Sequence, residues 1–177
     1  MVLEAVILEE VVLDKPPLEK VALFVDVQNV YYTCRQSFGQ QFDYTAFWAR
    51  VTAGRQVVAA YAYAIDRGDE KQRQFQYRLQ TLGFTLRLKP FIQRTDGTAK
   101  GDWDVGITID MLESAAQADT LVLVSGDGDF AILAERLRHH YGKCVEVYGV
   151  PALTAKALMD AADSFIAVDA SLLLPAR

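Results

Sequence analysis

The stretch Leu121-Val122-Leu123-Val124-Ser125-Gly126-Asp127-Gly128-Asp129-Phe130 determines how the rest of the chain is interpreted. Its four consecutive apolar residues predict a strand that is buried on both faces, as in a parallel sheet. Gly126 and Gly128 permit a tight turn after this strand. Open α/β sheets bind ligands outside the carboxyl ends of their strands, so Asp127 and Asp129 are expected at a ligand site. A second interpretation stays open, in which Asp129 caps the next helix and Asp127 only closes the turn.

The composition is that of a soluble globular protein of one domain. The chain has 177 residues, of which 51% are hydrophobic and 23% are charged, and these values exclude a disordered chain. Its formal net charge of -5 argues against attraction of the whole surface to nucleic acid, but it permits a local basic face. Cys34 and Cys144 lie far apart and form no metal-binding pair, so we expect a reducing, cytoplasmic location. No apolar run is long enough to predict a membrane span.

The first 17 residues differ from the rest of the chain. Valine and leucine alternate there with the acidic residues Glu4, Glu9, Glu10 and Asp14, and two prolines end the segment. A signal peptide is excluded because a basic start is missing and acids interrupt the apolar residues. The pattern fits an edge strand, a short helix or an arm that packs on another subunit, and the last option makes a homodimer possible. We expect residues 18–174 to form a single domain.

Strands and helices are expected to alternate from residue 21 onward. The apolar patterns predict strands at residues 21–25, 57–65, 84–89, 121–124, 144–148 and 165–168, and helices at residues 27–38, 43–52, 69–82, 104–116, 130–141 and 154–161. Asp96-Gly97 predicts a turn or small hairpin within residues 91–100. This alternation is typical of a three-layer α/β/α, Rossmann-like domain whose central sheet is mainly parallel.

Acidic residues recur where this fold is expected to bind a ligand. Asp26 and Asp127 each follow an apolar strand, Asp129 comes two residues later, and Asp104 begins a helix. If the two strands are neighbours, these carboxylates converge at one edge of the sheet, and Asn29 adds an uncharged oxygen. Oxygen ligands without histidine or cysteine favour Mg²⁺ or Mn²⁺ over zinc. A divalent ion would also relieve the repulsion between the carboxylates.

Three stretches of the sequence resemble the signature stretches of NYN domains, in particular of their LabA-like bacterial branch. These stretches are Phe24-Val25-Asp26-Val27-Gln28-Asn29, Lys100-Gly101-Asp102-Trp103-Asp104-Val105 and Ser125-Gly126-Asp127-Gly128-Asp129-Phe130. The resemblance spans residues 21–168, and the family is similar to the PIN nucleases. It implies a PIN-like fold, an Mg²⁺ or Mn²⁺ site and metal-dependent ribonuclease activity. The sequence departs from many relatives at Val27-Gln28, where they carry a small residue and a glycine.

The resemblance assigns roles to individual residues. Asp26, Asp104, Asp127 and Asp129 match the acidic catalytic site of the family, Asn29 matches its asparagine and Lys100 matches its lysine. We expect the metal to be held by Asp26, Asp104 and Asp127, with Asp129 and Asn29 binding directly or through water. The ion would then orient and deprotonate a water molecule for attack on a phosphodiester.

A basic segment predicts a nucleic-acid partner. Residues 67–100 contain eight basic and three acidic side chains, which fits phosphate binding, although a solvated basic helix face is the alternative. Aromatic residues near the predicted site can stack on unpaired bases, so single-stranded RNA is favoured over duplex, and DNA is possible. The residues expected to bind the nucleic acid are Tyr31, Arg67, Lys71, Arg94 and Lys100. The alternative function is a non-catalytic RNA-binding or regulatory module.

Overall fold

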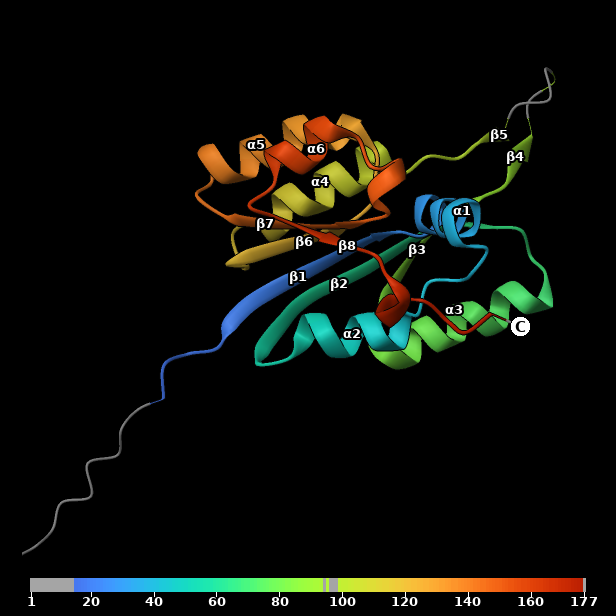
Figure 1. Cartoon of the computed structure of the whole chain (residues 1–177), viewed down its shortest axis with the longest axis horizontal. Helices are drawn as coiled ribbons and strands as arrows, with labels where there is room; N and C mark the ends of the chain where they lie inside the picture. The colour runs from blue at the N-terminus through green and yellow to red at the C-terminus, as the bar shows by residue number, and fades with distance from the viewer. Residues whose placement is uncertain (1–14, 94, 96–98, 177) are drawn as a thin grey trace, which may run out of the picture.

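The computed structural model describes residues 15–93, 95 and 99–176, and its centre is a sheet of six parallel strands (Figure 1). The strand order is β3-β2-β1-β6-β7-β8. The bounds are β1 (Glu19–Asp26), β2 (Arg55–Asp66), β3 (Thr85–Pro90), β6 (Thr120–Val124), β7 (Cys144–Gly149) and β8 (Ser164–Ala167). A separate antiparallel pair, β4 (Ile92–Gln93) and β5 (Ala99–Lys100), confirms the predicted hairpin.

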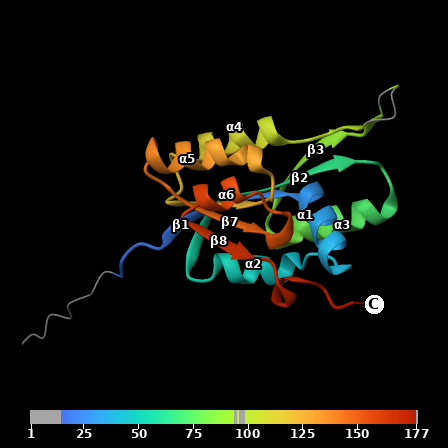
Figure 2. The same cartoon turned by 45° about the horizontal axis from the view of Figure 1, so that its top comes forward.

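Helices cover both faces of the sheet, so the predicted three-layer α/β/α fold is confirmed (Figures 1 and 2). One layer holds α1 (Val27–Phe38), α2 (Tyr44–Thr52) and α3 (Glu70–Leu82), and the other holds α4 (Asp104–Ser114), α5 (Ala131–His139) and α6 (Lys156–Ala161). Alternate side chains of β1 pack into the two separate cores, with Leu23 in the first and Phe24 in the second. Within the described residues, no helix combines the length and the apolar character that a membrane span requires.

The strand order reverses at β1, and this reversal creates the crevice in which ligands are expected. From β1 the chain proceeds through β2 to β3 on one side, and it then returns through α4 to place β6 on the other side. Val25 of β1 lies opposite Val124 of β6. The two strands that precede Asp26 and Asp127 are therefore neighbours, and their carboxyl ends lie at the same edge of the sheet.

Several predicted element boundaries differ from the structure. The helix predicted from residue 130 is preceded by a 3₁₀ turn, η1 (Gly128–Phe130), and α5 begins only at Ala131. The helix predicted from residue 154 begins at Lys156, after a second 3₁₀ turn, η2 (Pro151–Leu153). The reason is that Ala155 keeps an extended backbone and donates its N–H to the carbonyl of Gly126, at 3.0 Å.

The predicted N-terminal arm lies largely outside the described residues. Residues 15–17 are exposed and have no regular secondary structure. An edge strand, a short helix and a subunit contact therefore all stay predictions for residues 1–14, as does the homodimer.

At the amino ends of the strands, Arg55 joins neighbouring parts of the sheet. Its Nε contacts Glu19 of β1 at 2.9 Å, and its guanidinium also pairs with Glu146 of β7. Glu19 in turn accepts a hydrogen bond from the hydroxyl of Thr120 on β6. These polar contacts connect β2, β1, β6 and β7 at this edge of the sheet.

The turn after β6 is packed against the loop that precedes α6. A Cβ atom added at Gly126 would lie 2.5 Å from the carbonyl oxygen of Leu153 and 3.2 Å from Cα of Thr154. Both of these atoms belong to the backbone, so a small movement of a side chain cannot relieve the contact. The turn therefore requires glycine at this position.

We expect Gly126→Ala to lower the free energy of unfolding by about 1–3 kcal/mol, as is typical of overpacking in a close-packed site. Urea unfolding followed by circular dichroism measures the change. Gly101→Ala serves as the control, because its Cβ would meet only the flexible side chain of Ile65 and the loss should be smaller. Equal losses for the two variants would contradict the role of the backbone contact.

Candidate metal centre

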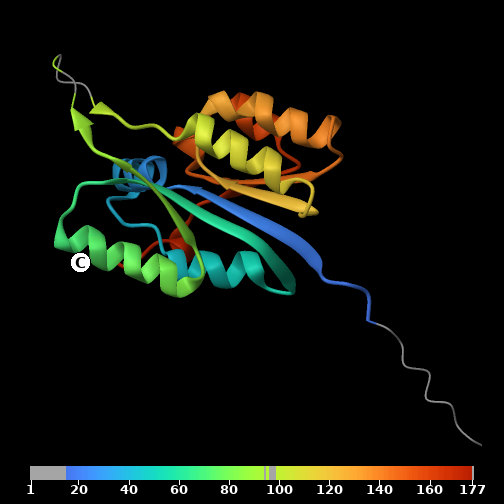
Figure 3. The ribbon, with the colours of Figure 1, turned by 180° about the vertical axis from the view of Figure 1, so that it is seen from behind.

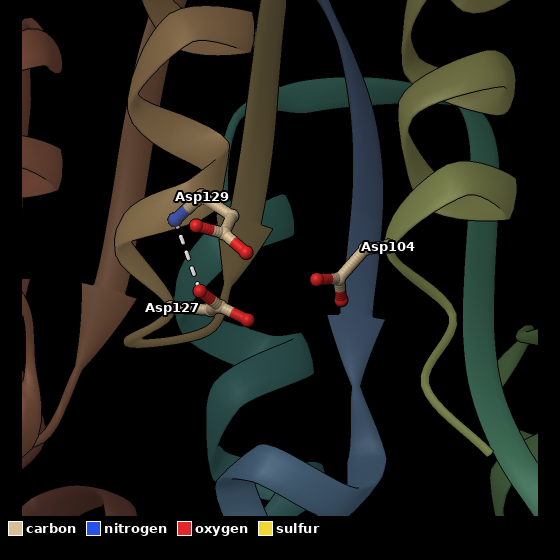
Figure 4. Close-up of side chains that lie close together, drawn as sticks. All are labelled: Asp104, Asp127 and Asp129. Atoms are coloured by element: carbon tan, nitrogen blue, oxygen red, sulfur yellow. Dashed lines mark hydrogen bonds between the residues drawn. The ribbon is translucent and has the colours of Figure 1, made fainter. Parts of the chain in front are cut away.

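Three carboxylates meet at the carboxyl edge of the sheet (Figure 4). Asp104 begins α4, Asp127 follows β6 and Asp129 lies within η1. One oxygen from each residue lies within 4.8 Å of the others, and in the described part of the chain this is the one group of acidic, histidine or cysteine residues that meets that criterion. Two oxygens that bind one Mg²⁺ or Ca²⁺ from opposite sides, each at about 2.1–2.4 Å from the ion, are about 4.2–4.8 Å apart, close to the separation found here. The donor set therefore fits a hard divalent cation.

Asp127 both caps the 3₁₀ turn and faces Asp104. Its Oδ1 accepts the backbone N–H of Asp129 at 2.9 Å (Figure 4). Asp129 does not cap α5. The N-cap residue of this helix is Phe130, and no side chain accepts a hydrogen bond from the backbone N–H groups at its N-terminus. The interpretation of Asp129 as a helix cap is therefore wrong. Its carboxylate is exposed and points toward the other two acids.

Asp26 lies deeper than the three clustered acids and, among the described residues, does not belong to their group. One of its carboxylate oxygens accepts a hydrogen bond from the hydroxyl of Ser125 at 3.2 Å. The other oxygen caps α1 by accepting the N–H of Asn29 at 3.4 Å. The expected trio was Asp26, Asp104 and Asp127, whereas the structure brings Asp129 into the group and puts Asp26 behind it.

Two further side chains hold the acidic turn in place. The hydroxyl of Ser125 also accepts the N–H of Asp127 at 3.2 Å, so one hydroxyl connects Asp26 with Asp127. Asn29 accepts the N–H of Gly126 at 2.9 Å and thereby joins α1 to the turn after β6. The sequence predicted Asn29 as a metal ligand, and the structure gives its oxygen a partner in the turn. Ser125 was missed, although its position directly before Gly126 could have indicated this role.

The carboxylates disturb one another's protonation. Burial raises the pKa of Asp26 to about 6, with smaller contributions from the negative charges of Asp127 and Asp102. Burial and the charges of Asp127, Asp102 and Asp26 raise the pKa of Asp104 to about 7. Asp102 is exposed, and its carboxylate accepts the N–H of Asp104 at 3.3 Å. Sequence reasoning missed this residue, although it stands only two positions before Asp104.

Comparison with known proteins identifies the family. The model of the NYN domain matches residues 20–171. The chain belongs to the NYN domain family. It is 32% identical over 159 residues to the low amplitude and bright protein LabA of Synechococcus elongatus. This match covers 83% of this chain and 82% of LabA. It is also similar to the crystal structure of VPA0982, a protein of unknown function from Vibrio parahaemolyticus. The TM-score is 0.85 and the identity 56%, over 89% of this chain and 97% of that one.

In this NYN domain, Trp103 precedes α4 and holds the start of this helix through contacts with residues of β2 and β3. Its Nε1 donates to the carbonyl of Ala64 at 2.9 Å, and its ring lies 5.4 Å from that of Tyr63. The ammonium group of Lys89 lies 4.4 Å from the Trp103 ring centre and donates to the carbonyl of Asp102 at 2.8 Å. Trp103 is thus a packing residue that positions Asp104. Lys89 thus holds the backbone at Asp102, and only its membership of the basic segment was evident from the sequence.

The residues predicted to bind nucleic acid lie in different places in the NYN domain. Tyr31, Arg67 and Lys71 are exposed and line a common groove. Lys100 belongs to β5, and Arg94 lies outside the described residues.

The raised pKa of Asp104 predicts that the charged form of this residue lowers the free energy of unfolding of the metal-free NYN domain. Its pKa rises from 3.8 to about 7 on folding, so the folded protein binds this proton more tightly than the unfolded chain does. Stability should therefore fall as the pH rises from about 4 to 7. We expect Asp104→Asn to raise Tm at pH 8 in EDTA by about 2–4 °C, or roughly 1 kcal/mol, a small value because solvent screens the partly exposed carboxylate.

Thermal unfolding at pH 5 and pH 8 measures this effect. The difference between Asp104→Asn and the natural protein should be larger at pH 8 than at pH 5. Asp160→Asn is the control, since it removes only an exposed ion pair with Lys156 and should change Tm little at either pH. A loss of stability at pH 8 on replacing Asp104 would show that its charge is not repelled by its neighbours.

Proposed function

We propose that this NYN domain is a metal-dependent nuclease that hydrolyses phosphodiester bonds in RNA. The observation that carries the proposal is the group formed by Asp104, Asp127 and Asp129, whose oxygens lie within 4.8 Å of one another. This group stands at the carboxyl edge of β1 and β6, where a sheet of this kind binds its ligands. Membership of the NYN domain family supports the same chemistry.

Each acid has a distinct role in this proposal. Asp104, Asp127 and Asp129 would hold Mg²⁺ or Mn²⁺, and this ion would activate a water molecule and neutralise charge on the phosphate. Asp26 and Ser125 keep Asp127 in position through the shared hydroxyl, and Asn29 fixes the turn through Gly126. The negative charge of Asp26 also favours a cation at the neighbouring Asp104.

The substrate is a nucleic-acid strand held through its phosphates. Arg67 and Lys71 are exposed beside the carboxyl end of β2, and Tyr31 offers a ring that is 44% exposed for stacking on a base. Lys100 and Arg94 stay predictions from the sequence as further phosphate contacts. Stacking requires unpaired bases, so we propose single-stranded RNA as the main substrate and single-stranded DNA as a weaker one.

We also propose that the protein acts in the cytoplasm. Cys34 and Cys144 are both free thiols, as is usual in a reducing compartment.

We expect the purified full chain to cleave single-stranded RNA in the presence of Mn²⁺ or Mg²⁺ and to lose this activity in EDTA. Asp127→Asn should reduce the rate at least about a hundredfold, or roughly 2.7 kcal/mol, because it removes one negative ligand from the ion. A fluorescently labelled oligonucleotide, separated on a denaturing gel, measures the rate.

Asp160→Asn on the exposed face of α6 is the matched control and should retain the activity, while circular dichroism verifies that both variants are folded. Binding of the RNA without cleavage under any divalent ion would overturn the nuclease proposal and support the non-catalytic module. Faster cleavage of single-stranded DNA than of RNA would instead reassign the substrate.

A further inference from the structure

A groove of about 1590 Å³ runs between α1, α3 and the C-terminal segment. Its volume exceeds the roughly 300–1,000 Å³ that is typical of small-molecule sites. Its lining includes Val27 and Gln28 at the start of α1, next to Asp26, as well as Ile65 at the end of β2. The lining of the groove therefore extends from the edge of the sheet that carries the acids along α1 and α3. Figure 3 shows the backbone of these two helices, α1 in blue and α3 in green.

One side of this α1–α3 groove is a continuous polar and aromatic stripe on α1. Gln28, Tyr31 and Arg35 follow one another at spacings of three and four residues, so they share a helix face that leads away from Asp26. Arg35 donates to the hydroxyl of Tyr31 at 2.9 Å, which holds the two side chains together. Tyr32 packs edge-on against Tyr31, with ring centres 5.3 Å apart.

Aromatic side chains along the α1–α3 groove are exposed to an unusual degree. Tyr31 is 44% exposed, Tyr32 is 51% exposed and, on the α3 side, Tyr77 is 70% exposed. Of the four exposed tyrosines in the described part of the chain, these three line the groove, and only Tyr141 lies elsewhere. Exposed rings with a polar tip are suited to a partner that offers flat apolar faces and polar edges, as nucleobases do.

The charge of the α1–α3 groove is opposite to that of the whole protein. Five basic residues line it (Arg35, Arg67, Lys71, Arg73 and Arg78), with two acidic residues, Asp69 and Glu70. Both acidic side chains have partners within the protein. Asp69 caps α3 by accepting the backbone N–H of Gln72, and Glu70 pairs with Arg73 at 3.8 Å. Among the described residues, none of the other four basic side chains forms an ion pair. In a chain of net charge -5, this groove is therefore matched to an anionic ligand.

We propose that the α1–α3 groove binds the single strand of RNA that extends from the metal centre. In this inference, which rests on the proposed nuclease function, Arg35, Lys71 and Arg78 bind phosphates while Tyr31, Tyr32 and Tyr77 stack on bases. The wall of the groove also carries Gln28 and Gln74, whose amide groups provide hydrogen bonds to base edges. The groove gives the enzyme a preference for substrates that continue past the cleaved bond.

Binding measured without cleavage tests the proposal. The full chain is kept in EDTA, and fluorescence anisotropy follows a labelled oligouridine of about 12 nucleotides, within the range of known single-strand sites. The double variant Tyr31→Ala/Tyr77→Ala should weaken binding at least about thirtyfold, because two rings that stack on bases are lost. The double variant Arg35→Gln/Arg78→Gln should lower the salt dependence of log K by about 1.4, because two phosphate contacts are lost at roughly 0.7 each.

The matched control is Tyr141→Ala/Arg136→Gln, which makes the same kinds of change at and just after the end of α5 in the opposite layer. It should bind the oligonucleotide as the natural protein does. Equal weakening by the control, or unchanged affinity and salt dependence in both groove variants, overturns the assignment of the groove. Preferential binding of a duplex of the same length also overturns it.

The two proposals fail in different ways. Normal groove binding with no cleavage under Mn²⁺ or Mg²⁺ leaves the α1–α3 groove as a binding site and removes the nuclease function. Cleavage with groove variants that bind RNA normally keeps the nuclease function and removes the groove.

Discussion

The parallel pairing of β1 with β6 is the contact on which the candidate metal centre depends. Val25 and Val124 lie opposite each other, so the chain leaves both strands at the same level and delivers Asp26 and Asp127 to one edge. A register slip of one residue would turn each side chain of a strand toward the opposite face. Every other element of the site is attached to this pair, since α1 continues from β1, η1 continues from the turn after β6, and α4 packs on β1.

The same arrangement makes the metal-free site electrostatically unfavourable. Burial and neighbouring carboxylates raise the pKa of both Asp26 and Asp104, and the fold compensates only in part. Hydrogen bonds from Ser125 and Asn29 stabilise the charged form of Asp26, whereas the clustered Asp104 keeps a pKa of about 7. Ionisable groups whose pKa is strongly shifted by burial and by like charges are frequently functional, because such an arrangement does not stabilise the fold.

The sequence predicted the layers, the sheet and the edge that carries the acids, because apolar runs and the residues that end them are local signals. It did not predict which acids would meet. Asp26 and Asp129 differ through tertiary contacts: Ser125 and Asn29 hold Asp26 inward, and the 3₁₀ turn directs Asp129 outward. Predicting the start of α6 also failed, because Gly126 accepts a hydrogen bond from Ala155, which follows it by 29 positions. The roles of Asp102 and Lys89 depend in the same way on how β3 and α4 pack around Trp103.

The polar contacts of Arg55 at the far edge of the sheet bear on the geometry of the metal centre. They join β2, β1, β6 and β7 near the amino ends of the strands, and Glu19 stands seven residues before Asp26 on β1. At roughly 3.3 Å per residue, the two edges are separated by about 23 Å of stiff strand. Sheet strands resist stretching and sliding, so a fixed alignment at one end is transmitted to the other. The contacts of Arg55 at the amino-end edge therefore help to fix the strand alignment that places Asp26 and Asp127 at the opposite edge.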